Sequence, residues 1–194
     1  WIPMSMRGLR RVWRSVTRCF STSASGPHIH PGAFVAPNAT IIHRVAVGEE
    51  SSIWYNCVLR GDVASIRIGK RSNIQDGTII HVARPKNDEE GLDTTIGDGV
   101  TVGHMAVLHA CTIEDNAFVG MKACVMDGAR VKSYGMLAAG SLLTPGKVVE
   151  SGELWGGSPA KLMRKLKQEE ISSIKTSADD YVETARNMHS LPSF

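Results

Sequence analysis

Aliphatic residues recur at every sixth position along most of this chain. The longest uninterrupted series consists of Ile113, Val119, Val125, Val131, Leu137, Leu143 and Val149. Three shorter series precede it: Val35, Ile41, Val47, Ile53 and Leu59; Ile68, Ile74 and Ile80; and Ile96, Val102 and Leu108. A period of six fits neither an α-helix nor a simple alternating strand, and it is typical of a parallel β-helix. The pattern therefore predicts an all-β solenoid in which three hexapeptides form one triangular coil of about 18 residues.

Two insertions lengthen the spacing of the anchors, by three residues after Leu59 and by about ten residues after His81. When the anchors are counted in threes across these insertions, Arg60, His81 and His109 fall in register on successive coils. Neighbouring coils lie about 4.8 Å apart, the spacing of paired strands. Two imidazoles stacked in this way can both reach one zinc ion, since Zn–N distances are near 2.0 Å.

A third histidine, His104, falls on a different face of the predicted prism. It comes two residues after the anchor Val102, and Asp76 occupies the same position one coil earlier, with Gln75 beside it. A side chain on that face cannot complete the site of its own chain, but the same face of a neighbouring subunit can. Heterologous contacts that close into a threefold ring would repeat this three times. We therefore predict a trimer with zinc at each interface.

The type of metal site follows from its ligands. Three imidazoles with an open fourth position are typical of catalytic zinc, whereas structural zinc closes with four ligands and usually uses cysteine. The four cysteines show no C-x-x-C spacing, which disfavours a structural zinc site. Ordinary surface or core positions are the simpler interpretation for the remaining histidines, which are His28, His30, His43 and His189.

Several motifs together resemble the gamma class of carbonic anhydrases over residues 27–185. They are Arg60-Gly61-Asp62, Asn73-Ile74-Gln75-Asp76-Gly77, His81, Gly103-His104, His109 and Gly156-Gly157-Ser158-Pro159-Ala160-Lys161. The resemblance implies a left-handed β-helix, an exception to the usual right-handed crossover. It also implies a homotrimer or heterotrimer with Zn²⁺ between subunits, Fe²⁺ and Co²⁺ being alternative metals, and reversible hydration of CO2 to bicarbonate.

The resemblance also assigns roles to residues. It implies that zinc is held by His81 and His109 of one chain and His104 of the next. Five further residues are candidates for the catalytic machinery: Arg60 and Asp62 as a pair that bridges subunits, Gln75 and Asp76 as residues that orient hydroxide and substrate, and Tyr181 as a contact from the C-terminal helix, for which simple packing is the alternative.

Proton transfer is less well specified by the sequence. The archaeal prototype of the family uses glutamates, one directly after the position of Asp62, where this chain has Val63. An acidic cluster in the inserted loop at 84–93 could serve instead, or it could be a solvated excursion. Slow catalysis, or none, is therefore compatible with an intact metal site.

The two ends of the chain differ from the repeats. Residues 1–26 contain five arginines and a serine-rich run but no acid, which is typical of a mitochondrial targeting segment. Their apolar residues fall on one helical face, so we expect a basic amphipathic helix. Residues 27–157 are assigned to the β-helix and 158–194 to a C-terminal helical segment, with Ser158-Pro159 as its N-cap and first residue. The expected apolar face of that helix comprises Ile171, Ile174, Ala178, Tyr181, Val182, Ala185 and Met188.

Two functional hypotheses are compatible with these patterns. The first is a zinc-dependent CO2 hydratase on the matrix side of the mitochondrial inner membrane. The second is a structural subunit, because gamma carbonic anhydrase-like proteins form a matrix-facing module on the membrane arm of respiratory complex I. A hexapeptide acyltransferase is disfavoured, since its catalytic histidine acts as a base without a three-histidine metal site. No nucleic-acid partner is expected, because the net charge of +3 comes mostly from the N-terminal arm.

Overall fold

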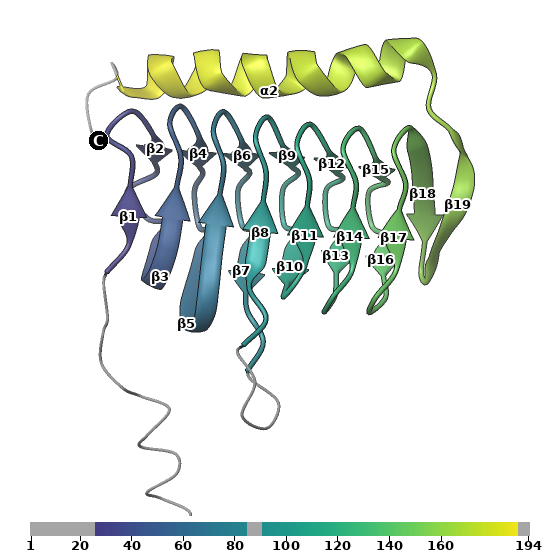
Figure 1. Ribbon diagram of the computed structural model, residues 1–194. Coiled ribbons are helices and arrows are strands. Elements are labelled where there is room, and N and C mark those ends of the chain that lie inside the picture. The colour runs from purple at the N-terminus through teal and green to yellow at the C-terminus, as the bar shows by residue number, and fades with distance from the viewer. Residues whose placement is uncertain (1–25, 85–90, 190–194) are drawn as a thin grey trace, which may run out of the picture.

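The computed structural model describes residues 26–84 and 91–189. These residues form a prism of stacked parallel strands with one long helix laid along it (Figure 1). The predicted parallel β-solenoid with a C-terminal helix is therefore confirmed. The predicted amphipathic helix of the N-terminal arm lies outside the described residues.

The prism has three faces, and each coil contributes one strand or half-strand to each face. The first face contains β7 (Ile79–His81), β10 (Val107–His109), β13 (Cys124–Val125), β16 (Leu142–Leu143) and the first halves of β3 (Thr40–Val47) and β5 (Val58–Ile68). The second face contains β1 (His28–Ile29), β8 (Thr94–Ile96), β11 (Thr112–Ile113), β14 (Arg130–Val131), β17 (Val148–Val149) and the second halves of β3 and β5. Because β3 and β5 continue through a corner, these two faces form one 11-stranded sheet.

The third face is a separate eight-stranded sheet. Its parallel strands are β2 (Phe34–Val35), β4 (Ser52–Ile53), β6 (Asn73–Ile74), β9 (Thr101–Val102), β12 (Phe118–Val119), β15 (Met136–Leu137) and β18 (Glu153–Gly157). The antiparallel strand β19 (Ala160–Lys165) pairs with β18 and ends the sheet. This hairpin covers the edge of the last coil, which would otherwise expose unpaired backbone groups.

The hexapeptide anchors form the core of the prism. Leu59, Ile80 and Leu108, which stack in one column, are all 0% exposed. Residues on either side of an anchor point outward, as in β7, where Ile79 is exposed, Ile80 is buried and His81 is half-buried. The six-residue period thus works because one large inward side chain per face fills the narrow interior, with a second, mostly small residue buried two positions earlier, such as Ala106 before Leu108.

Replacing Leu108 by alanine is expected to lower the free energy of unfolding by roughly 2–5 kcal/mol, because the interior cannot collapse onto the cavity. Urea denaturation followed by far-UV circular dichroism measures this. Leu92→Ala is the matched control, since Leu92 is 51% exposed. Equal midpoints for the two variants would contradict the assignment of the anchors to the core.

The C-terminal helix α2 (Gln168–His189) begins later than the sequence predicted. Ser158-Pro159 is not its N-terminus: that peptide bond is cis and lies in the turn between β18 and β19. The backbone after Pro159 continues as β19 because pairing with β18 satisfies its hydrogen-bonding groups. The helix starts where Glu170 can accept a hydrogen bond from the backbone N of Lys167 at 2.8 Å, one half of a capping box.

Helix α2 runs back along the third face, over β9, β6, β4 and β2 (Figure 1). The predicted apolar face is confirmed, since Ile174, Ala178, Val182 and Ala185 are at most 5% exposed. The helix therefore covers the outward side chains of the third face, where the predicted residue Gln75 lies.

Ion pairs also attach α2 to the early coils. Glu50 accepts hydrogen bonds from Arg186 of the helix and from Arg71, and Arg71 also contacts Asp179 at 2.7 Å. The hydrogen bond from Arg186 is the main reason that the pKa of Glu50 lies below its ordinary value. The helix is thus fixed by charge as well as by apolar contact.

Candidate metal centre

Three predicted residues stack on the first face as the repeat required. Arg60 pairs with His81 between β5 and β7, and His81 pairs with His109 between β7 and β10. The centroids of the two imidazole rings are 5.2 Å apart, close to the spacing of paired strands. The insertion between the histidines therefore leaves their register intact.

The two imidazoles face one another through single nitrogens. His81 Nδ1 lies 3.2 Å from His109 Nε2. The other nitrogen of each ring contacts a carboxylate: His81 Nε2 lies 2.9 Å from Asp62 Oδ1, and His109 Nδ1 lies 2.5 Å from Asp127 Oδ1. A carboxylate therefore orients each ring through its outer nitrogen, and the two inner nitrogens face one another.

These contacts determine where the ring protons are. An ionised carboxylate can only accept hydrogen bonds, so His81 donates from Nε2 to Asp62, and His109 donates from Nδ1 to Asp127. A neutral imidazole carries only one N–H, which leaves a lone pair on each inner nitrogen. Two lone pairs at 3.2 Å repel unless a proton or a metal cation lies between them.

The distance between the inner nitrogens also fits zinc. Two nitrogens that each lie about 2.0–2.1 Å from a tetrahedral zinc ion are roughly 3.3 Å apart. Histidines that bind metals usually donate their second N–H to a carboxylate or carbonyl, as His81 and His109 do here. The donor set of this face is therefore suited to a divalent metal.

Asp62 is fixed within its own chain. The preceding residue, Gly61, allows β5 to lie close to β3, because a Cβ at this position would collide with the carbonyl of Arg44 on β3. Arg60 donates to Asp62, which also accepts from His81. Burial raises the pKa of Asp62, but the hydrogen bonds from His81 and Arg60 outweigh burial and lower it below the ordinary value. The bridging of subunits by Arg60 and Asp62 stays a prediction.

His104 lies apart from the histidine pair, in the corner between β9 and β10. Its Nδ1 lies 2.8 Å from Asp76 Oδ2, so the predicted stacking of these two residues is confirmed. Asp76 Oδ1 also accepts from the backbone N of Tyr55 at 3.3 Å. Within residues 26–84 and 91–189, no three His, Cys, Asp or Glu side chains gather closely enough to hold a metal ion.

Gln75 is 6% exposed and belongs to a polar network beneath α2. Its Nε2 donates to Asn73 Oδ1 at 3.0 Å, and Asn73 Nδ2 donates to Thr101 Oγ1 at 2.9 Å. Thr101 Oγ1 lies 3.4 Å from Ser177 Oγ of the helix. The orientation of the Gln75 amide is therefore tied to the third face and to α2.

Tyr181 projects from α2 toward the corner that contains Asp76. Its ring packs edge-on against Trp54, with centroids 5.5 Å apart. Burial, and then the negative charge of Asp76, raises the pKa of Tyr181. Packing and proximity to the Asp76 corner thus both hold, while a catalytic contact of Tyr181 stays a prediction.

The acidic loop contributes one described carboxylate, and it is engaged. Asp93 accepts from the backbone N of Ser65 at 2.7 Å and also pairs with Arg67. Asp93 therefore fastens the end of the loop to β5. The other acids of the loop, at 88–90, lie outside the described residues.

Asp127 is the one residue of this centre that the sequence reasoning missed. It lies 18 residues after His109, whereas paired residues of β10 and β13 are 17 apart. Extending the column of Arg60, His81 and His109 by one more coil points instead to Met126, because Val107 and Leu108 pair with Cys124 and Val125, and Asp127 is the next residue, at the corner. Asp127 also belongs to no motif of the family resemblance, so no sequence signal marks it.

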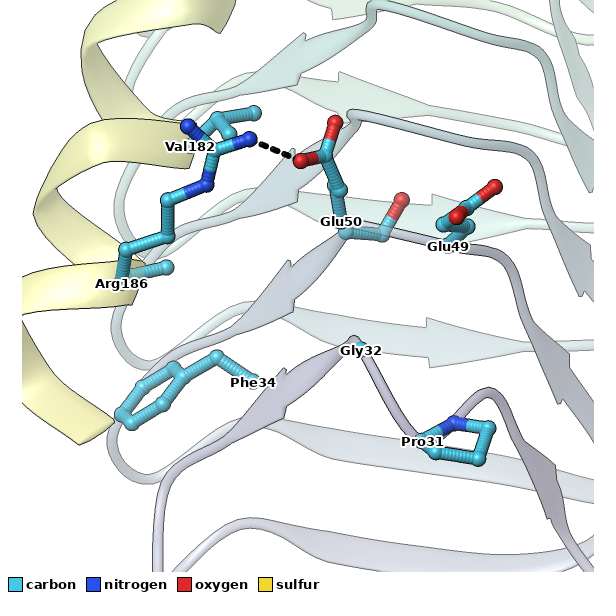
Figure 2. A pocket seen from close by; sticks show the side chains of 9 residues that line it. Pro31, Gly32, Phe34, Glu49, Glu50, Val182 and Arg186 are labelled. Carbon is cyan, nitrogen blue, oxygen red and sulfur yellow. Dashed lines mark hydrogen bonds and ion pairs between the residues drawn. The ribbon is translucent and has the colours of Figure 1, made fainter.

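A hollow of the described structure lies elsewhere. About 440 Å³ opens between α2 and the first coils, and Figure 2 shows Phe34 and the Glu50–Arg186 pair at its wall. None of the predicted site residues lines it. The candidate centre is thus an outward-facing surface of the prism.

Fold and site together define a hexapeptide-repeat β-helix protein with paired, carboxylate-held imidazoles on one face. The family model described as "Bacterial transferase hexapeptide (six repeats)" matches residues 26–61. "Probable carbonic anhydrase" of Methanocaldococcus jannaschii is 42% identical, over 80% of this chain and 94% of that protein. "Gamma carbonic anhydrase 2, mitochondrial" of Arabidopsis thaliana is 52% identical, over 93% of this chain. The chain belongs to the gamma carbonic anhydrase family.

The comparisons add two qualifications. The chain spans 66% of the length of that Arabidopsis protein and 58% of its gamma carbonic anhydrase 1, which is less than two thirds of each. The crystal structure of a hexapeptide transferase family protein from Anaplasma phagocytophilum is 50% identical in sequence, the match covers 83% of this chain and 92% of that one, and the TM-score is 0.78. The fold is thus that of left-handed hexapeptide-repeat β-helices, and relatives of this kind carry both anhydrase and transferase names.

Proposed function

We propose that this protein is a metal-dependent carbonic anhydrase that interconverts CO2 and bicarbonate. The observation that carries the proposal is the convergence of two inner imidazole nitrogens, 3.2 Å apart, with both outer nitrogens held by carboxylates. His81 and His109 would hold the metal, and His104 of a neighbouring chain would be the third ligand. The relatives that are named carbonic anhydrases support the same reaction.

A bound zinc ion would supply Lewis acidity, which brings the pKa of water to about 7, the established value for carbonic anhydrases in general, and so provides hydroxide at neutral pH. The residues of the chain prepare the surroundings. Asp62 and Asp76 hold His81 and His104, respectively, in fixed orientations. Gln75, buried and fixed by Asn73, is suited to orient CO2 rather than to transfer a proton.

The proposal includes a trimer, because one chain brings only two histidines together. Exposed apolar side chains flank all three histidines: Ile79 and Val107 come two residues before His81 and His109, and Met105 follows His104. Their exposed fractions are 47%, 38% and 58%, respectively. Burial of such side chains against a second chain would be favourable, and an apolar patch of this kind often marks a protein interface. The partners are copies of this chain or related gamma carbonic anhydrase-like subunits.

We further propose a mitochondrial location, on the matrix side of the inner membrane, as a peripheral module of respiratory complex I. The mitochondrial names of three Arabidopsis relatives and the arginine-rich segment at 1–20 support mitochondria. No helix in the described part of the chain is long and apolar enough to span a membrane. Native electrophoresis of mitochondrial membranes tests the assignment: migration only as a free trimer would contradict the complex I partnership.

The activity is tested on the purified full-length chain. We expect zinc, or Fe²⁺ or Co²⁺ in its place, at up to one ion per chain by elemental analysis, and CO2 hydration in a stopped-flow assay with a pH indicator. The transferase names of similar structures favour acyl transfer as the second candidate, so the same preparation is offered acetyl-CoA with amine acceptors. Acyl transfer without metal binding would overturn the proposal. Metal binding without CO2 hydration would favour the structural role in complex I.

A further inference from the structure

We propose that Asp127 is a positioning residue that selects the tautomer and fixes the orientation of His109 for metal binding. The inference rests on the proposed function, because it concerns how the chain prepares one of the two metal ligands of the first face. No motif of the family resemblance includes Asp127. The observation that points to Asp127 is the contact of its Oδ1 with His109 Nδ1 at 2.5 Å.

The contact selects one form of the imidazole. A carboxylate offers only acceptor oxygens, so it favours the tautomer of His109 that carries its proton on Nδ1. That tautomer leaves a lone pair on Nε2, which faces His81 Nδ1 at 3.2 Å. The opposite tautomer would place a proton on Nε2 and block the metal. Asp127 therefore acts on the metal through His109 without touching it.

The arrangement mirrors the one at the other histidine. Asp62 holds His81 Nε2 at 2.9 Å, so the two imidazoles are held by carboxylates at opposite ends of the pair. Carboxylates of this kind set the orientation and basicity of metal-binding histidines. If only Asp62 were present, His109 could rotate or change its tautomer, and the inner nitrogens would converge only part of the time.

Backbone hydrogen bonds fix the position of Asp127 relative to His109. Its carbonyl accepts a hydrogen bond from Gly146 N at 3.0 Å, in the next coil. The following residue, Gly128, donates to the carbonyl of Ala110 at 2.7 Å, in the preceding coil. The corner is thus tied on both sides, so the carboxylate is placed by the solenoid itself and not by a free loop.

A contribution to stability alone is the alternative role for this pair. The side chains of His109 and Asp127 are 37% and 43% exposed. Even fully charged pairs at exposed positions contribute little to folding, since solvent screens them, and a neutral imidazole paired with a carboxylate is not expected to contribute more. Loss of the Asp127 carboxylate should therefore leave thermal unfolding almost unchanged, and its effect should appear in metal affinity.

The first test measures zinc affinity of the full-length chain by competition with a chromogenic chelator, with Zn²⁺ alone as the probe. Asp127→Asn should weaken binding roughly 10–100-fold, because an amide can donate as well as accept and no longer selects one tautomer. Asp115→Asn is the matched control: Asp115 accepts a backbone hydrogen bond from Asp98 N at 2.8 Å, within another corner. We expect that variant to bind zinc as the unmodified protein does.

The second test does not depend on metal. In metal-free protein labelled with ¹⁵N-histidine, the nitrogen shifts of His109 should report a protonated Nδ1, and Asp127→Asn should give a mixture of tautomers. Unchanged zinc affinity or an unchanged tautomer in Asp127→Asn would overturn the inference. Failure of the unmodified protein to bind zinc would overturn the proposed function instead, and the tautomer measurement would still decide the role of Asp127.

Discussion

Replacement of His81 or His109 by alanine is expected to remove the metal and reduce CO2 hydration to the uncatalysed rate. Each substitution deletes one of two nitrogens that converge at 3.2 Å. Loss of a residue that only hydrogen-bonds to a metal-binding side chain lowers metal affinity about 10–100-fold. Loss of a metal-binding side chain itself should therefore lower metal affinity more than about 100-fold. Zinc per chain, by elemental analysis after dialysis, and stopped-flow hydration rates measure the two effects.

The fold should survive these substitutions. Both histidines point outward, and the core is formed by anchors such as Ile80 and Leu108. His28→Ala is the control, because His28 is exposed on β1 and far along the prism from the pair. A His81→Ala protein that retains stoichiometric zinc and activity would show that the first face is not the metal site.

Mixing two inactive variants is expected to restore activity. His104→Ala chains keep His81 and His109, and His81→Ala chains keep His104. If each site takes His104 from a neighbour, a trimer that contains both variants forms complete sites at some interfaces. Random assembly from equal amounts should restore about one quarter of the sites of the unmodified protein. Hydration rates after mixed refolding or co-expression give the fraction directly.

The control for this experiment is a mixture of His81→Ala with His109→Ala chains. Both variants damage the same half of the site, so no interface can be complete and no activity should return. Verified mixed trimers of His104→Ala and His81→Ala without any recovery would mean that one chain supplies all three ligands. That result would contradict the subunit arrangement but not the identity of the ligands.

Much of the fold could be read from the hydrophobic period. An anchor every sixth residue fixes one large inward side chain per face, so the register of Arg60, His81 and His109 follows from counting, even across the insertion. The stacking of His104 on Asp76 was predicted in the same way. These predictions succeed because each coil contacts mainly its neighbours, and sequence separation therefore translates directly into spatial separation.

The prediction was wrong where the repeat ends. Ser158-Pro159 has the sequence of a helix start, yet the chain forms β19 there. The local signal was outweighed by a non-local one, because the last coil offers an unpaired strand edge and pairing with it satisfies more backbone groups than an early helix turn would. Helix formation is delayed to Gln168, where Glu170 supplies the cap.

The sequence by itself thus determined the solenoid, the stacking of the histidines and the apolar face of α2, since all three depend on periodic spacing. The tertiary structure decided which nitrogen of each ring is turned inward and which carboxylate holds the other. Asp127 joins His109 through a corner whose shape is set by hydrogen bonds to the coils on either side. Such contacts depend on side-chain direction within a packed corner, which the spacing of residues along the chain does not specify.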